Sequence, residues 1–164
     1  MIRAAVITVS DSAAAGQRED LSGPALCQLA QELGWTVTQR AIVADDRMLI
    51  AKTITNYSNL ELILTTGGTG LSPRDVTPEA VKLVAEREVP GFGELMRAEG
   101  LKSTRFAPLS RSGAATRGTA LILMLPGSPK GAVESLKAVS HLVPHAVDLL
   151  QGRTEHKEKP GGQS

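Results

Sequence analysis

The sequence predicts a doubly wound α/β fold with a mostly parallel central sheet. Four apolar runs suit buried strands, at residues 4–9, 36–43, 60–65 and 120–125. Three of them are nearly continuous in apolar residues, which is typical of parallel strands that are covered on both faces. Segments with helical periodicity separate the runs, and this alternation of strand and helix favours parallel strands joined by helices.

The first two predicted helices have clear signals at their ends. Residues 21–33 form a helical pattern that stops at Gly34, a residue suited to terminate a helix. Residues 47–57 form the next pattern, which follows Asp45 and Asp46. Either carboxylate could accept a hydrogen bond from the first turn, so the sequence leaves the identity of this cap open.

Proline marks the later helices. Residues 78–88 follow Thr77, and threonine before proline suits the N-cap and the first position of a helix. Residues 129–150 follow Ser128 in the same way, and Pro144 predicts a kink or a break inside this helix.

The segment before the last strand carries weaker signals. Residues 92–101 favour a short helix, and residues 106–117 favour a hairpin or edge strands. The folded domain is expected to span residues 1–151. Residues 152–164 are polar, charged and glycine-rich, which predicts a flexible C-terminal tail.

Composition argues against several classes of function. The formal net charge of the 164 residues is +1, so no basic stripe is available for nucleic acid. One Trp, one Tyr and two Phe are too scattered to form a stacking platform for bases. No stretch approaches the ~18 apolar residues needed to span a membrane, and the first apolar run is interpreted as a strand instead of a signal peptide. We therefore expect a soluble, cytoplasmic protein with neither a nucleic-acid nor a membrane partner.

Residue types that bind small polar ligands gather at the ends of the predicted strands. In an open α/β sheet, ligands bind at the carboxyl ends of the strands. Glycine, serine, threonine or aspartate is abundant at all four ends, which are residues 10–12, 43–46, 66–70 and 126–129. This convergence predicts a binding site at that edge of the sheet.

The glycine-rich turn after the third strand is the strongest candidate. Gly67, Gly68 and Gly70 can adopt backbone angles closed to other residues, so that successive N–H groups form a nest for phosphate oxygens. A tight turn without a ligand is the alternative, since the spacing matches neither a P-loop nor the dinucleotide fingerprint. Arg74 and Asp75 favour binding, because they add a cation for phosphate and a carboxylate for a metal.

Two aspartates near neighbouring strand ends predict a magnesium site. Asp45 and Asp75 would face one crevice, and Mg²⁺ binds through one or two carboxylates together with substrate phosphates. The alternative is that Asp45 only caps the helix that follows it. His141 and His145 are spaced four apart, but no further ligand completes a metal site, so we expect packing or solvated roles for them.

Several motifs combine into a family signature. They begin with Thr-Thr-Gly-Gly-Thr-Gly at residues 65–70 and Pro-Arg-Asp-Val-Thr-Pro-Glu-Ala at residues 73–80, and continue at residues 8–12, 20–23, 87–94, 110–111 and 125–130. Together they resemble the MogA/MoaB family, the molybdopterin adenylyltransferases, and the module is also similar to the G domain of gephyrin. The resemblance covers about residues 2–151.

This resemblance implies a three-layer α/β/α sandwich, usually a homotrimer, with nucleotidyltransferase activity. The enzyme would adenylylate molybdopterin with Mg·ATP and release pyrophosphate, which prepares the pterin for molybdenum insertion and implies the molybdenum-insertion protein as a partner. Asp45 and Asp75 match the two aspartates essential to that reaction. Ala44 departs from the pattern, because the family usually has proline there, and this should loosen the turn slightly.

The resemblance also implies roles for individual residues. Asp45 and Asp75 would bind Mg²⁺ and position the reactants. The phosphates would be held by Gly67, Gly68, Thr69 and Gly70. The pterin side would comprise Ser10, Asp11, Ser110, Pro126, Gly127, Ser128 and Pro129. The candidate phosphate cations are Arg74, Arg111 and Lys130, and for Lys130 an exposed solubilising charge is the alternative.

Other functions stay open at this point. A MoaB-type paralogue would bind molybdopterin without adenylylating it, although the presence of Asp45 and Asp75 argues against a loss of activity. Domains of molybdenum-insertion or CinA-type proteins usually sit in longer chains and carry a different residue after the two glycines. A scaffold role, as in gephyrin, finds no supporting segment beyond the enzyme module. A serine hydrolase is disfavoured, because no histidine lies at a strand end to activate Ser12 or Ser128.

Overall fold

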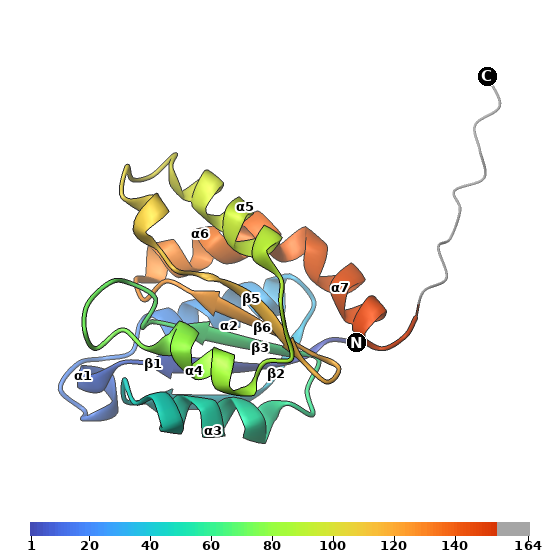
Figure 1. Cartoon of the computed structure of the whole chain (residues 1–164), viewed down its shortest axis with the longest axis horizontal. Helices are drawn as coiled ribbons and strands as arrows, with labels where there is room; N and C mark the ends of the chain where they lie inside the picture. The colour runs from blue at the N-terminus through green and yellow to red at the C-terminus, as the bar shows by residue number, and fades with distance from the viewer. Residues whose placement is uncertain (154–164) are drawn as a thin grey trace.

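The computed structural model describes residues 1–153, which form a six-stranded sheet with helices on both faces (Figure 1). The strands are β1 (Arg3–Val9), β2 (Thr36–Val43), β3 (Leu62–Thr66), β4 (Arg87–Glu88), β5 (Gly113–Arg117) and β6 (Ala120–Leu125). Their order in the sheet is β2-β1-β3-β6-β5-β4. The first four in this order run parallel, and β5 is antiparallel to both of its neighbours. The mostly parallel sheet predicted from the apolar runs is confirmed.

The helices form one layer on each face of the sheet (Figure 1). One layer comprises α2 (Ser22–Glu32), α5 (Pro90–Gly100), α6 (Pro129–Val139) and α7 (Val143–Leu150), and the other comprises α3 (Arg47–Tyr57) and α4 (Thr77–Val84). Successive strand residues point into opposite layers: Leu62 and Leu64 pack against the first, and Ile63 packs against the second. All three are 0% exposed, which explains the continuous apolar runs and confirms the three-layer α/β/α sandwich.

The structure decides which aspartate caps α3. Asp46 has extended backbone angles, and its side chain accepts a hydrogen bond from the N–H of Leu49 at 2.8 Å. Asp46 is therefore the N-cap, and the alternative that Asp45 serves only as this cap is excluded.

The helix predicted at residues 78–88 is shorter in the structure, because its last two predicted residues form a strand. The helix α4 ends at Val84, and Arg87 and Glu88 form β4 at the edge of the sheet. The N–H of Glu86 donates to the carbonyl of Thr116 at 2.8 Å, so the backbone here pairs with β5. This pairing between distant segments overrides the local helical pattern.

The break predicted at Pro144 is confirmed. The helix α6 stops at Val139, the 3-10 turn η2 (Ser140–Leu142) follows, and α7 begins with Pro144 in its first turn. His141 and His145 therefore lie on different elements. No helix within residues 1–153 is long and apolar enough to cross a membrane. Residues 154–164, most of the predicted tail, lie outside the described part.

The segment of weaker signals contains a helix, a short turn and one strand of a hairpin. The helix predicted at residues 92–101 is confirmed as α5, and the 3-10 turn η1 (Ala107–Leu109) follows it. Residues 106–117 hold only one strand, β5, which pairs with β6 in a hairpin that turns at Gly118 and with β4 on its other side, so the predicted edge position is wrong.

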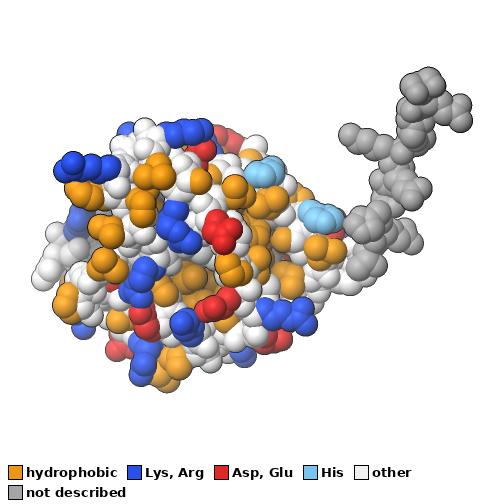
Figure 2. Space-filling view, turned by 45° about the horizontal axis from the view of Figure 1, so that its top comes forward, with side chains coloured by type: hydrophobic (Ala, Val, Ile, Leu, Met, Phe, Trp, Pro, Cys, Tyr) orange, Lys and Arg blue, Asp and Glu red, His pale blue; other side chains and the backbone are white. Residues whose placement is uncertain are grey.

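Exposed apolar side chains follow α5 and η1. Four of them, exposed by 41–59%, are Leu95, Leu101, Phe106 and Leu109. Figure 2 shows apolar side chains interspersed with charges of both signs on the face that it displays.

The sheet topology places two strand ends side by side at the predicted site. After β1 the chain moves to β2 on one side, and after β3 it moves toward β6 on the other. Such a change of direction opens a crevice at the carboxyl ends of the two adjacent strands, where open α/β sheets bind ligands. The crevice here is bounded by Ser10 after β1 and by Gly67 after β3.

Candidate active site

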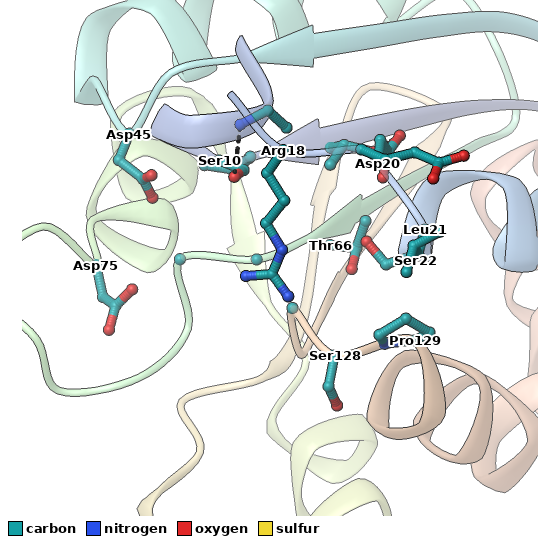
Figure 3. Close-up of a pocket in the computed structure, with 17 residues that line it drawn as sticks. Ser10, Arg18, Asp20, Leu21, Ser22, Asp45, Thr66, Asp75, Ser128 and Pro129 are labelled. Carbon is teal, nitrogen blue, oxygen red and sulfur yellow. Dashed lines mark hydrogen bonds between the residues drawn. The ribbon is translucent and has the colours of Figure 1, made fainter. Parts of the chain in front are cut away.

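A pocket of about 380 Å³ lies at the carboxyl ends of β1, β3 and β6 (Figure 3). The N-terminal ends of α2 and α6 border it, through Ser22 and Pro129. The described residues that line it are Thr8, Val9, Ser10, Ala13, Arg18, Glu19, Asp20, Leu21, Ser22, Asp45, Thr66, Gly67, Gly68, Asp75, Gly127, Ser128 and Pro129.

The structure divides the predicted site residues between two hollows. The main pocket contains Ser10, Asp45, Gly67, Gly68, Asp75, Gly127, Ser128 and Pro129. A second hollow of about 340 Å³ is lined by Thr69, Gly70, Leu71, Leu109, Ser110, Pro126 and Gly127. Gly127 lines both, so the two hollows adjoin. Asp11, Arg74 and Arg111 line neither of them.

The turn after β3 requires glycine at two positions. Gly67 has a φ of 105°, and a Cβ atom there would lie 2.2 Å from the carbonyl oxygen of Val9. Gly68 has a φ of 69°, and its Cβ would lie 2.3 Å from the hydroxyl oxygen of Thr77. The N–H of Gly67 donates to the carbonyl of Leu125 at 3.0 Å, so this group is already used by the sheet. The predicted phosphate nest is accordingly limited to the groups after Gly67.

Thr77 fastens the turn to α4. The sequence predicted Thr77 as the N-cap, but Val76 holds that position and Thr77 is the first helical residue. Its hydroxyl donates to the carbonyl of Gly67 at 2.8 Å, and its N–H donates to the carbonyl of Gly68 at 3.1 Å. The Thr77 side chain is 0% exposed, and its hydroxyl stabilises the glycine turn and does not cap the helix.

Asp11 and Asp45 form two reciprocal hydrogen bonds, in which the carboxylate of each accepts from the backbone N–H of the other. The N–H of Asp11 donates to Oδ2 of Asp45, and the N–H of Asp45 donates to Oδ1 of Asp11, both at 2.9 Å. This reciprocal pair ties the end of β1 to the end of β2. Two hydrogen bonds of 2.9 Å from Arg74 complete the contacts of Asp11 and, with the bond from Asp45, hold the pKa of Asp11 below its ordinary value.

The carboxylates of Asp45 and Asp75 lie against the same glycine turn. A Cβ on Gly68 would lie 3.3 Å from Oδ1 of Asp45, and a Cβ on Gly70 would lie 2.8 Å from Oδ2 of Asp75. Figure 3 shows both carboxylates on one side of the pocket. Burial is the main cause that raises the pKa of Asp45, and the negative charges of Asp11 and Asp75 add to it. A cation between these carboxylates would relieve that repulsion.

Arg111 is held by protein groups on the loop that carries Asp75. Its guanidinium donates to the carbonyl of Gly70 at 3.0 Å and to the carbonyl of Asp75 at 2.8 Å. It also pairs with the carboxylate of Glu79, and its backbone N–H donates to the carbonyl of Thr69 at 2.8 Å. These contacts give Arg111 a role in fixing the loop, and phosphate binding by Arg111 stays a prediction.

The serines at two strand ends act as helix caps inside the pocket. The hydroxyl of Ser10 accepts from the N–H of Ala13 at 3.2 Å, at the start of α1 (Asp11–Ala14). The hydroxyl of Ser128 accepts from the N–H of Gly131 at 3.0 Å, at the start of α6. Lys130 lines neither hollow and lies 3.8 Å from the carboxylate of Glu134, consistent with a solubilising charge.

Residues 20–23 were part of the family signature, but neither Asp20 nor Arg18, in the loop before α2, was predicted as a site residue. Asp20 accepts from the hydroxyl of Thr8 at 2.9 Å and from the N–H of Gly23 at 3.0 Å, and it lines the pocket together with Arg18. An aspartate three residues before the N–H that it accepts from is a helix-start signal, which could have placed Asp20 near the site. Arg18 carries no such local signal.

Comparison with known proteins agrees with the motifs and the geometry. The family described as "Probable molybdopterin binding domain" matches residues 5–145. A molybdopterin adenylyltransferase from Helicobacter pylori is 44% identical over 156 residues, which cover 92% of this chain and 89% of that protein. Gephyrin from Dictyostelium discoideum is 39% identical over 160 residues, and the match covers 90% of this chain and 22% of gephyrin.

The solved structures give the same result. The molybdopterin biosynthesis enzyme MoaB from Thermus thermophilus superposes with a TM-score of 0.86 at 46% identity, covering 93% of this chain and 98% of that one. The resemblance stated from the motifs is confirmed: this chain belongs to the molybdopterin-binding domain family that includes MogA and MoaB.

Proposed function

We propose that the chain transfers the adenylyl group of Mg·ATP to the terminal phosphate of molybdopterin and releases pyrophosphate. The observation that carries this proposal is the pair of carboxylates, Asp45 and Asp75, placed against one glycine turn in one pocket. The named activity of the Helicobacter pylori relative, 44% identical over most of both chains, supports it.

The reaction needs positioning more than proton transfer. A phosphate oxygen of molybdopterin forms a bond to the α-phosphorus of ATP, the bond from that phosphorus to the bridging oxygen breaks, and pyrophosphate leaves with the electron pair. A phosphate monoester has a second pKa of about 6, so the nucleophile is already largely a dianion near neutral pH. No histidine is among the described residues that line the pocket, in keeping with a reaction that requires no strong base.

The residues present fit a magnesium ion. Asp45 and Asp75 offer carboxylate oxygens on the two sides of the turn. Within residues 1–153 no third His, Cys, Asp or Glu joins such a pair to form a larger ligand group. Two carboxylates with the remaining positions left to water and phosphate is a common arrangement for Mg²⁺. When bound, the ion would neutralise charge on the phosphates of ATP.

The chain's own groups would orient the two substrates. The Gly68–Gly70 turn offers backbone N–H groups toward the phosphates, and Arg111 keeps that turn and Asp75 in register through the carbonyls of Gly70 and Asp75. The adjoining hollow, which contains Ser110 and Pro126, would take the pterin, as the resemblance implies. Gly127 lies where the two hollows meet, and a side chain there would approach Gly67 at 3.3 Å.

The test is pyrophosphate release from Mg·ATP in the presence and absence of molybdopterin. We expect turnover by the wild type only when molybdopterin is present. Asp75→Asn keeps an oxygen that can accept from the N–H of Ser72 but removes the charge, so we expect a loss of more than about 100-fold with the fold retained. Glu32→Gln, at an exposed position in the last turn of α2, is the matched control and should retain wild-type turnover.

The same assay distinguishes the second candidate function. The solved structure of 46% identity is named MoaB, and a MoaB-type paralogue could bind molybdopterin without adenylylating it. If the wild type binds molybdopterin but never consumes ATP, adenylyl transfer is refuted. Binding without turnover would then favour this paralogue or a molybdenum-insertion-type domain.

We also propose that the chain acts as a cytoplasmic homotrimer that delivers its product to a molybdenum-insertion protein. The exposed apolar side chains of α5 and η1, including Leu95 and Phe106, support association between copies. Light scattering coupled to size exclusion should give three times the chain mass of 17.2 kDa, and a single-chain mass would refute the trimer.

A further inference from the structure

The main pocket is acidic although both proposed substrates are polyanions. Four of its described lining residues are carboxylates, namely Glu19, Asp20, Asp45 and Asp75. Arg18 is the only lysine or arginine among the described residues that line it. A pocket for two phosphate-bearing substrates needs a cation besides magnesium, and Arg18 is the residue that can supply it.

The other arginines at this edge of the sheet are engaged elsewhere. Arg74 makes two hydrogen bonds of 2.9 Å with the carboxylate of Asp11. Arg111 is held by two backbone carbonyls and by Glu79. The side chain of Arg18, by contrast, makes no hydrogen bond or ion pair with any residue in the range 1–153.

The loop that carries Arg18 is fastened on both sides. Before it, the N–H of Gln17 donates to the carbonyl of Ser12 at 2.9 Å. After it, Asp20 accepts from Thr8 of β1 at 2.9 Å and from the N–H of Gly23 at 3.0 Å. Two residues separate these anchors, so the position of the Arg18 backbone at the edge of the pocket is set by the fold.

The side chain reaches into the pocket. Figure 3 shows Arg18 extending into the middle of the pocket toward Ser128, with Asp45 and Asp75 to one side of it and Asp20 to the other. The guanidinium therefore lies between Asp20 and the pair of Asp45 and Asp75, which suits a metal. A phosphate between the guanidinium and that pair would meet positive charge from both directions, provided that the metal is present.

We propose that Arg18 binds a phosphate group of one of the two substrates through its guanidinium. This inference rests on the proposed function and adds a binding residue to it. Guanidinium is well suited to the role, because its planar fork donates two hydrogen bonds to two phosphate oxygens. The phosphate is either the terminal phosphate of molybdopterin or the triphosphate of ATP.

The experiment measures the dissociation constants of molybdopterin and of Mg·ATP separately, by calorimetry, at two salt concentrations. Arg18→Ala should weaken the binding of one substrate by about 10- to 100-fold, the range for loss of a hydrogen bond to a charged group. Arg18→Lys should recover part of the loss, because it keeps the charge but not the fork. Arg40→Ala, which removes an exposed arginine on β2, is the matched control and should leave both constants unchanged.

The outcomes assign the source of the phosphate. A loss for molybdopterin alone places Arg18 on the pterin phosphate, and a loss for Mg·ATP alone places it on the triphosphate. The affected affinity should also depend less on salt in Arg18→Ala than in the wild type. If Arg18→Ala binds both substrates as the wild type does, the inference is overturned. These are binding measurements, so a wild type that binds without turnover would refute adenylyl transfer and still test Arg18.

Discussion

Gly67 offers the sharpest test of how the fold builds the site. The substitution Gly67→Ala places a Cβ atom 2.2 Å from the carbonyl oxygen of Val9, well inside the 3.0 Å below which real Cβ atoms essentially never come. The obstacle is backbone at the end of a central strand, so it cannot rotate away as a side chain would. Either β1 or the turn must move.

The expected cost has two parts. An alanine at a φ of 105° is strained by about 1–3 kcal/mol. Displacing packed backbone adds about 1–3 kcal/mol, the usual cost of overpacking. We expect a total of about 2–6 kcal/mol, a large fraction of a typical domain stability of about 5–15 kcal/mol. Gly34→Ala isolates the first part, because Gly34 has a φ of 82° and nothing within 4 Å of its Cβ position.

The assay is urea unfolding combined with pyrophosphate release. Gly34→Ala should lose about 1–3 kcal/mol of unfolding free energy and keep its turnover, since Gly34 lies at the end of α2 away from the pocket. Gly67→Ala should lose more than that and reduce turnover by at least about 100-fold, because the turn that faces Asp45 is displaced. Equal losses of stability in the two variants would refute the argument that contact with Val9 requires glycine.

Two further predictions concern ion pairs. Arg111→Met should raise the Mg²⁺ concentration for half-maximal turnover about 10-fold or more, because the loop that carries Asp75 loses its hydrogen bond from Arg111. It should also lower the free energy of unfolding by about 2–3 kcal/mol, because Glu79 loses its cation and already has one carboxylate oxygen that is buried without a partner among the described residues. Magnesium titrations and urea unfolding measure the two effects, and an unchanged magnesium requirement would leave Arg111 no role in placing Asp75. For Glu61, burial alone would raise the pKa, but the hydrogen bonds and charge of Arg3, together with a backbone hydrogen bond of Glu61, outweigh it and hold the pKa below its ordinary value of 4.5. The pair therefore stabilises the fold above pH 4.5 and loses this contribution as the pH falls through the lowered folded value. Arg3→Met should cost about 1–2 kcal/mol at pH 7, at the low end for a charged hydrogen bond because Arg3 is 46% exposed, and much less at pH 3. A pH-independent difference between the two unfolding curves would contradict this assignment.

The apolar pattern was sufficient to predict the architecture. A strand covered on both faces must bury every side chain, so runs such as residues 60–65 identify parallel strands without knowledge of their partners. The glycine turn could likewise be found, because a backbone with positive φ restricts the residue type locally, and Asp75 follows that turn in the family motif. Parallel strands also end at one edge of the sheet, which was enough to bring Asp45 and Asp75 to one crevice.

Other features depend on distant partners and could not be read from local pattern. Asp45 and Asp46 are equivalent as caps until the fold pairs Asp45 with the backbone of Asp11. Arg74 looks like a phosphate ligand until Asp11, 63 residues away, is placed beside it.

The pocket shows the same division between sequence and tertiary structure. From the sequence, the carboxyl ends of the strands were expected to form a phosphate site, because strand direction determines where those ends meet. Only the tertiary structure decided which charges in that site are neutralised by protein and which face the ligand. A side chain such as Arg18 has no local signature, since its role depends on the absence of a partner within the described residues as much as on its own chemistry.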